Sequence, residues 1–226
     1  MQKATMEYSA QTNSYVVPLG TGSRHNDLEL RYSLRSLQPK DCWLIGTRPA
    51  WYQGNYIKQG ETGISTLNIW QKLLTACNTP EISDPFIYGN DDYFYLQDVP
   101  LLNYYGNLSG NNEYKRIARY TLDILKYNNL PILFFDVHRP MLIYKQLFID
   151  AYNFFGNHLK INQSLLVKSC YGNYAGLDGT LVTDCKLTYW NGDPNIDMFS
   201  IGDDCIDVMF KAYCENKWVD KSIYEI

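Results

Sequence analysis

The sequence lacks the features that mark membrane-inserted and secreted proteins. No apolar run approaches the roughly 20 residues that a membrane-spanning helix needs, and residues 1–13 are polar, without the apolar stretch of a signal peptide. The six cysteines are scattered and form no Cys-x-x-Cys pair, which favours reduced and mostly buried thiols. We therefore expect a cytoplasmic protein, or one of the host cytoplasm if a virus encodes it, with no membrane insertion and a flexible N-terminus over residues 1–13.

Positive charge is also scarce. The chain carries 20 Lys and Arg against 24 Asp and Glu, a net charge of -4, so no overall field attracts nucleic acid or an anionic membrane. A local basic strip is compatible with this balance, and one predicted helix would carry four basic residues: Lys115, Arg116, Arg119 and Lys126. Nothing in the sequence indicates an oligomeric state.

Strand-like and helix-like stretches alternate along the chain, without repeats, low-complexity segments or an evident linker. Short apolar runs predict strands at residues 15–19, 42–46, 85–89, 131–137 and 198–201. Helical spacing predicts helices that begin at Asp27 as the cap, around residues 70–77, over 116–126, at Pro140 and at Asp203. This alternation predicts a single compact α/β domain over residues 1–226, with a mostly parallel sheet and helices on both faces.

Four of the five predicted helices carry an apolar stripe that is expected to face the core. The four stripes are Leu30, Leu34 and Leu37; Trp70, Leu73, Leu74 and Cys77; Ile143, Leu147, Ala151 and Phe154; and Ile206, Met209, Phe210 and Tyr213. Residues 159–195, rich in Gly, Asn and Tyr, fit no pattern.

Polar residues follow several of the predicted strands. The loop "GTGSRHND" (20–27), the pair Asp91–Asp92, His138 and Asp203 each come directly after an apolar run. In open α/β sheets, ligands bind at the carboxyl ends of the strands. We therefore expect these groups to meet at one edge of the sheet and to form a site.

Asp91 and Asp92 raise a question of their own, because two like charges follow the buried run of "FIYGNDDYFYL" (86–96). Such a pair repels itself unless a cation meets it. Adjacent carboxylates suit Mg²⁺ or Mn²⁺, which could bridge to the pyrophosphate of a nucleotide sugar. The alternative is an Asx turn that caps a loop and binds nothing.

His138 is the candidate general base, since a histidine's ordinary pKa lies near neutrality; the alternative is a ring held by loop carbonyls. The loop 20–27 offers Gly22 and Ser23 backbone N–H groups to a phosphate, next to a helix N-terminus. The candidate donor-binding residues are Thr21, Gly22, Ser23, Arg24 and Arg31, although Arg31 and Arg35 are equally placed to pair with Asp27 and Glu29.

Several segments resemble one known family. "NDLELRYSLRSL" (26–37), "CWLIGTRPAWYQG" (42–54) and "SDPFIYGNDDYFYL" (83–96) are similar to the second conserved region of the Stealth family. These are sugar-phosphate transferases of capsular polysaccharide synthesis, related to the lysosomal-enzyme N-acetylglucosamine-1-phosphotransferase. "FFDVHRPMLIYKQLF" (134–148) is similar to the third region, and "FSIGDD" (199–204) and "ENKWVDKSIYE" (215–225) resemble the closing segments. The resemblance covers most of the chain.

The resemblance implies a GT-A-like nucleotide-sugar transferase core that uses a divalent cation, Mg²⁺ or Mn²⁺. It carries metal or donor-phosphate roles to Asp91, Asp92 and Asp203, and catalytic roles to Asp92 and His138. GT-A enzymes usually space such acids as Asp-x-Asp, so the adjacent pair departs from that motif.

Two further segments depart from the family. The first strand, in "SYVVPLGTGS" (14–23), carries no acid, and "HLKINQSLLVKSC" (158–170) offers only Lys160 or Lys168 where the family has a catalytic arginine. A lysine lacks the bidentate grip of arginine on phosphate. Transfer of a sugar-1-phosphate and transfer of the sugar alone therefore both stay open.

The leading hypothesis is a metal-assisted transferase that moves a sugar or sugar-1-phosphate from a nucleotide-sugar donor to an acceptor hydroxyl. The acceptor is a glycan or a hydroxymethylated base in DNA. Contacts with the sugar or acceptor are expected from Trp51, Tyr52, Arg139 and Lys168. The competing hypothesis is a catalytically inactive module that binds a sugar or nucleotide, which the two altered segments favour.

Overall fold

The computed structural model describes residues 9–160 and 164–226. The predicted flexible N-terminus lies partly outside these residues, since 1–8 are not described. Residues 9–13 form a turn that is attached to the domain: the Gln11 side chain donates to the carbonyl of Gln38, and the Asn13 side chain donates to that of Pro85, each at 3.0 Å. These two bonds connect the turn to the segments that precede β2 and β4. Within the described residues, no helix has the length and apolarity to cross a membrane.

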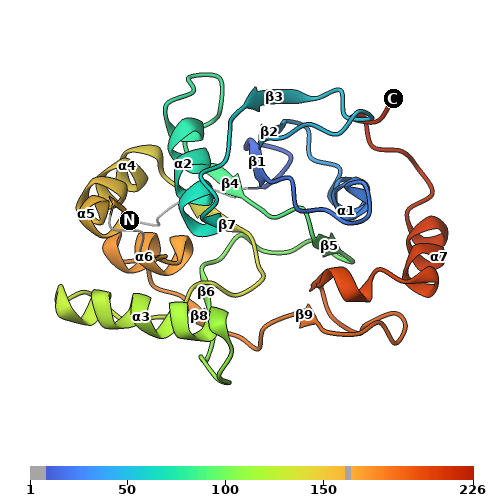
Figure 1. Ribbon diagram of the computed structural model, residues 1–226. Helices are drawn as coiled ribbons and strands as arrows, with labels where there is room; N and C mark the ends of the chain where they lie inside the picture. The colour runs from blue at the N-terminus through green and yellow to red at the C-terminus, as the bar shows by residue number, and fades with distance from the viewer. Residues whose placement is uncertain (1–8, 161–163) are drawn as a thin grey trace, which may run out of the picture.

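The chain forms one α/β domain built on a five-stranded mixed sheet (Figure 1). The strand order is β3-β2-β1-β4-β7, with β1(Tyr15–Leu19), β2(Cys42–Gly46), β3(Asn55–Lys58), β4(Phe86–Tyr88) and β7(Met141–Ile143). The first four strands run parallel, and only β7 pairs antiparallel, with β4. The mostly parallel sheet predicted from the sequence is confirmed. The strand β3, in a stretch rich in Gly and Tyr, was not predicted.

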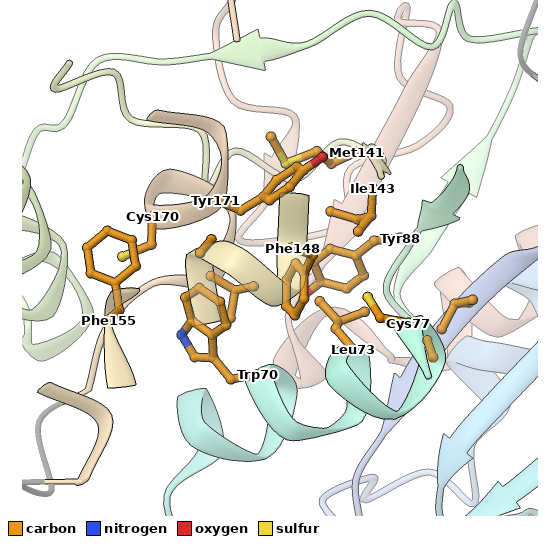
Figure 2. Packing of buried hydrophobic residues seen from close by; sticks show 14 of the residues in the cluster. Trp70, Leu73, Cys77, Tyr88, Met141, Ile143, Phe148, Phe155, Cys170 and Tyr171 are labelled. Atoms are coloured by element: carbon orange, nitrogen blue, oxygen red, sulfur yellow. The ribbon is translucent and has the colours of Figure 1, made fainter. Parts of the chain in front are cut away.

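Helices cover both faces of this sheet, as predicted. On one face, α1(Leu28–Leu37) buries Leu30 and Leu34 against β1 and β2. On the other face lie α2(Ser65–Cys77), α4(Lys145–Phe154) and α6(Val167–Tyr174). Figure 2 shows their shared core, in which the ring of Phe148 lies between Trp70, at 5.1 Å, and Tyr171, at 5.7 Å between centroids. This packing fixes α2 and α6 beside the sheet edge that carries the candidate site.

Smaller elements complete the domain. A three-stranded sheet has the order β5-β10-β9, and a two-stranded sheet pairs β6 with β8. The bounds are β5(Tyr93–Tyr95), β6(Tyr104–Tyr105), β8(Thr180–Leu181), β9(Lys186–Leu187), β10(Met198–Ile201), α3(Glu113–Tyr127), α5(Gly156–Lys160), a 3₁₀ turn η1(Asp203–Cys205) and α7(Val208–Lys217). The predicted strand at 198–201 is confirmed, and the six cysteines are free and buried, as expected.

The strand predicted over residues 131–137 is wrong. In this segment only Phe134 makes a β-bridge, to Gly106, and the strand of this region, β7, comes after His138. The reason lies in α6, whose side chains replace strand partners: Ser169 Oγ accepts the Phe135 N–H at 3.0 Å, and the Asn173 side chain accepts the Leu133 N–H at 2.9 Å. Phe134, Phe135 and Val137 are therefore buried without joining a sheet.

Two helix predictions also need correction. The helix expected from Pro140 begins at Lys145, because the apolar residues that follow the proline form β7; its buried residues are Phe148 and Ala151, whereas Leu147 and Phe154 are exposed. The last helix buries Phe210 and Cys214, and Met209 of the predicted stripe is exposed.

The cap predicted for α1 is also wrong. Asp27 makes no side-chain capping bond, and its own N–H donates to Ser23 Oγ at 2.9 Å. Asp27 has a left-handed backbone conformation with φ 55°, whereas an ordinary N-cap residue has an extended one. The chain therefore enters the helix through a left-handed turn.

Candidate functional site

The topology places the predicted site residues at one edge of the central sheet. From β1 the chain continues to β2 on one side, while β4 lies on the other side of β1, so the loops that follow β1 and β4 diverge. Such a switch point is where ligands bind in open α/β sheets. Because β7 runs antiparallel and pairs Met141 with Tyr88, His138 lies just before β7 at the same edge as Asp91 and Asp92.

A cleft of about 680 Å³ opens beside this edge. Its walls come from the N-terminal turns of α2, α3 and α6 and from the segments around β4 and His138. Polar and aromatic side chains of different elements converge on it: Tyr88, Asn90, Tyr93, Tyr114, His138 and Lys168. A volume of this size and this mixture of apolar walls with a few polar groups is typical of small-molecule sites.

His138 is held by an aspartate that the sequence did not single out. Its ring Nδ1 lies 2.8 Å and 3.0 Å from the two carboxylate oxygens of Asp184, and its backbone N–H donates to the same carboxylate at 2.9 Å. Burial alone would raise the pKa of Asp184, but the hydrogen bonds and charge of His138 outweigh it and lower the pKa to about 2. The other ring nitrogen, Nε2, makes no hydrogen bond to any described residue. This is the arrangement of an oriented general base.

Lys168 lies behind His138 and was expected to contact a sugar or acceptor. Its Nζ donates to the carbonyls of Val137 and Arg139 and to the Tyr93 hydroxyl, and burial lowers its pKa. The ammonium group thus donates its hydrogen bonds to other groups of the protein, although Lys168 also lines the cleft.

Asp91 and Asp92 differ in their surroundings. The Oδ2 atom of Asp92 accepts a 2.6 Å bond from Ser200 Oγ and lies 3.5 Å from Lys186 Nζ, whereas its buried Oδ1 has no hydrogen-bond partner among the described residues. Burial raises the pKa of Asp91, and the charges of Asp92 and Glu29 add to this, so that it reaches about 8. Both interpretations of the pair, a cation site and an Asx turn, are compatible with these surroundings.

The structure does not gather the predicted metal set of Asp91, Asp92 and Asp203. Asp203 pairs with Arg24, whose Nε lies 2.9 Å from its carboxylate, and no group of three or more His, Cys, Asp or Glu side chains within residues 9–160 and 164–226 is placed to hold a metal ion. A cation still fits the acidic pair in another way. Mg²⁺ commonly binds one or two carboxylates and completes its coordination with water and substrate phosphates, and the orphaned Oδ1 of Asp92 offers such a ligand.

Glu29, from the first turn of α1, is a neighbour that sequence reasoning missed as part of this cluster. Its side chain is buried, its Oε2 has no hydrogen-bond partner among the described residues, and its charge acts on Asp91. The only signal in the sequence was an acid at a helix start, which is common at such positions.

The predicted donor loop is tied to the protein at several points. Thr21 Oγ1 donates to Glu61 at 3.3 Å, and Ser23 Oγ accepts the N–H groups of His25 and Asp27. Arg24 is paired with Asp203. A Cβ atom built on Gly22 would have no neighbour within 4 Å, so the backbone of the loop is open at this residue.

Three other predicted ligand contacts lie away from the cleft. Arg31 stacks over the Trp51 ring at 4.9 Å and lies 3.6 Å from Glu225. The Trp51 carbonyl accepts the Ile226 N–H at 3.0 Å, so both residues hold the C-terminal segment. Tyr52 cannot touch a ligand, because it is fully buried and its hydroxyl donates to the Cys42 carbonyl at 2.9 Å. The prediction for Tyr52 is wrong: an aromatic side chain in a long loop turned inward to fill the core.

Arg139 is likewise occupied. Its two terminal nitrogens each lie 2.8 Å from the carboxylate of Asp197, and its guanidinium stacks over Tyr104 at 4.8 Å. A bidentate pair of this kind is among the strongest side-chain interactions. The predicted acceptor contact does not fit this geometry.

Comparison with known proteins adds no name to these observations. No protein-family model matches the chain, and no curated protein matches it.

Proposed function

We propose that this protein is a metal-assisted transferase that moves a sugar, or a sugar-1-phosphate, from a nucleotide-sugar donor to an acceptor hydroxyl. The observation that carries the proposal is the His138–Asp184 pair, with its 2.8 Å contact at Nδ1 and an Nε2 that makes no hydrogen bond to a described residue. The cleft beside it is also lined by Asn90 and Tyr93, which flank Asp91 and Asp92 in the sequence. A base and an acidic pair at one edge are what the transfer to a hydroxyl from an anionic donor requires.

The residues divide the work between the two substrates. His138 accepts the proton of the acceptor hydroxyl at Nε2, while Asp184 keeps the proton of the neutral ring on Nδ1 and stabilises the ring once it is charged. Asp92, through its free Oδ1, and Asp91 hold the divalent cation. When bound, Mg²⁺ or Mn²⁺ neutralises charge on the donor phosphates. The half-enclosed cleft limits the access of water to the reacting hydroxyl.

The motif resemblance to the Stealth family supports the same reading. The acidic pair after "FIYGN" and the histidine before "RP" are the residues to which it assigns family roles, and the sheet order and site edge are compatible with a GT-A-like core. No arginine replaces the missing one in the segment of Lys168, so transfer of the sugar alone is as compatible with the cleft as sugar-phosphate transfer. The acceptor is a glycan or a hydroxymethylated base in DNA.

A panel of nucleotide sugars tests the proposal. The protein is incubated with each donor and with Mg²⁺, Mn²⁺ or EDTA, and free nucleotide is measured with and without acceptors. Metal-dependent release of nucleoside diphosphate indicates sugar transfer or hydrolysis, and release of nucleoside monophosphate indicates transfer of the sugar phosphate. Binding of a donor without any release across the panel would instead support the inactive binding module.

A further inference from the structure

The peptide segment that carries His138 is held by hydrogen bonds from two other parts of the chain. On one side, residues of the segment 184–185 act directly on His138: Asp184 accepts its N–H, and Cys185 Sγ donates to its carbonyl at 2.9 Å. On the other side, Lys168 of α6 donates to the carbonyls of both neighbouring residues, Val137 and Arg139. The backbone on each side of the histidine is thus fixed by one buried ammonium group.

The bonds between α6 and this segment run in both directions. Asp136, two residues before His138, accepts the backbone N–H groups of Lys168 at 3.3 Å and Ser169 at 2.8 Å, and so caps the N-terminal turn of α6. The side chain of Lys168 returns from that same turn to the two carbonyls. The helix and the histidine segment therefore form one rigid unit.

The geometry leaves Lys168 little capacity for a ligand. An ammonium group has three hydrogens, and Nζ has three oxygen partners: the two carbonyls and the Tyr93 hydroxyl, the last at 3.3 Å. Lys168 is 5% exposed. Binding a phosphate would require the lysine to release one of these three partners, which is costly when no other donor replaces it.

We propose that Lys168 is a positioning residue for His138 and not a ligand of the donor phosphate. The inference rests on the proposed function insofar as it takes His138 as the base. In this role, Lys168 affects turnover by holding the imidazole of His138 in place. It does not bind phosphate, as an arginine in the same segment would.

The sharpest test uses Lys168→Arg, with Lys168→Met beside it and Lys58→Met as the control at an exposed lysine of β3. Arginine is a good phosphate ligand, but its planar fork is expected not to reproduce the three hydrogen bonds around Nζ. We expect kcat to fall about 10- to 100-fold in both Lys168 variants, as small misplacements of a catalytic group do, with the donor KM unchanged. An Arg variant with native kcat, or a Met variant with raised donor KM and native kcat, would overturn the proposal.

A double variant and a spectroscopic measurement complete the test. If Lys168 acts only through His138, adding Lys168→Met to His138→Gln lowers kcat no further, whereas an independent role gives an additional loss. Ring ¹⁵N shifts of His138 report the tautomer without any activity: we expect Nδ1–H alone in the native protein and a mixture in Lys168→Arg. An unchanged tautomer in that variant contradicts the positioning of His138 by Lys168, even if no donor is turned over. Failure of this inference is therefore distinguishable from failure of the proposed function. Should Lys168→Met not fold, the Arg variant and its spectrum decide.

Discussion

Asp184→Asn is the perturbation that separates a catalytic pair from a structural contact most clearly. The interaction with His138 holds the pKa of Asp184 at about 2, against an ordinary value of 3.8, a difference that corresponds to roughly 2.5 kcal/mol at 1.36 kcal/mol per unit. The Asp184 side chain is 36% exposed, so screening by solvent reduces the loss expected at neutral pH to roughly 1 kcal/mol. Because the folded-state pKa is lowered, this stabilisation is present above about pH 4 and is lost as pH falls through about 2.

The effect on turnover is expected to be much larger than the effect on stability. An Asn amide can donate to Nδ1, which favours the tautomer with its proton on Nε2, and that tautomer cannot accept the acceptor's proton. We expect kcat to fall on the order of 10²–10⁴-fold while donor affinity stays constant. Urea unfolding at pH 7 and initial rates at saturating donor measure the two effects, with Asp178→Asn as a control at an exposed aspartate outside the cleft. Full turnover in Asp184→Asn, despite the lost stability, would refute the assignment of the pair.

The remaining predictions concern the acidic pair and the acceptor. Asp92→Asn should abolish metal-dependent turnover without unfolding the protein, because the amide keeps the volume and can still accept from Ser200; circular dichroism and the nucleotide-release assay check this. Asp91→Asn should raise the melting temperature of the metal-free protein at pH 7, since burial and, after it, the charges of Asp92 and Glu29 make an ionisable carboxyl unfavourable there, whereas an amide carries no charge. Calorimetry should show the apparent Mg²⁺ affinity rising up to about tenfold per pH unit below about pH 8, where a proton on Asp91 competes with the cation. If the acceptor is DNA, Lys115→Ala with Arg119→Ala should reduce the salt slope of binding by roughly 2 in an electrophoretic shift.

Contrary outcomes are equally specific. Full activity in both Asp91→Asn and Asp92→Asn, with metal still required, would move the cation site to the region of Asp203 and Asp204. A Mg²⁺ affinity independent of pH would mean that Asp91 gives up no proton on binding.

The main sheet and its helices could be predicted because their patterns are local. The buried runs at β1, β2 and β4 and the apolar stripe of α2 depend on neighbouring residues alone. The segment 131–137 could not be predicted, because whether an apolar run joins a sheet depends on what else can satisfy its backbone, here Ser169 and Asn173 far along the chain.

The site could be predicted only in part, for a related reason. Asp91, Asp92 and His138 follow apolar runs and are visible as polar residues at the ends of buried segments. Asp184 lies in a stretch without periodicity, 46 residues from His138, so no pattern joins the two. The ion pair between Arg139 and Asp197 could not be predicted either, since Asp197 comes from another loop.

Turnover by His138→Gln tests the central claim most directly. The variant keeps a hydrogen-bonding side chain of similar size but cannot take up a proton, so it separates chemistry from architecture. With a donor identified from the nucleotide-sugar panel, nucleotide release and donor binding are measured for the native protein and the variant at saturating Mg²⁺ and acceptor. The account predicts a loss of turnover of about 10²–10⁴-fold with donor affinity within twofold of the native value. Normal turnover in His138→Gln would show that the proposed base is wrong, and a joint loss of stability and donor binding would show that His138 is a structural residue.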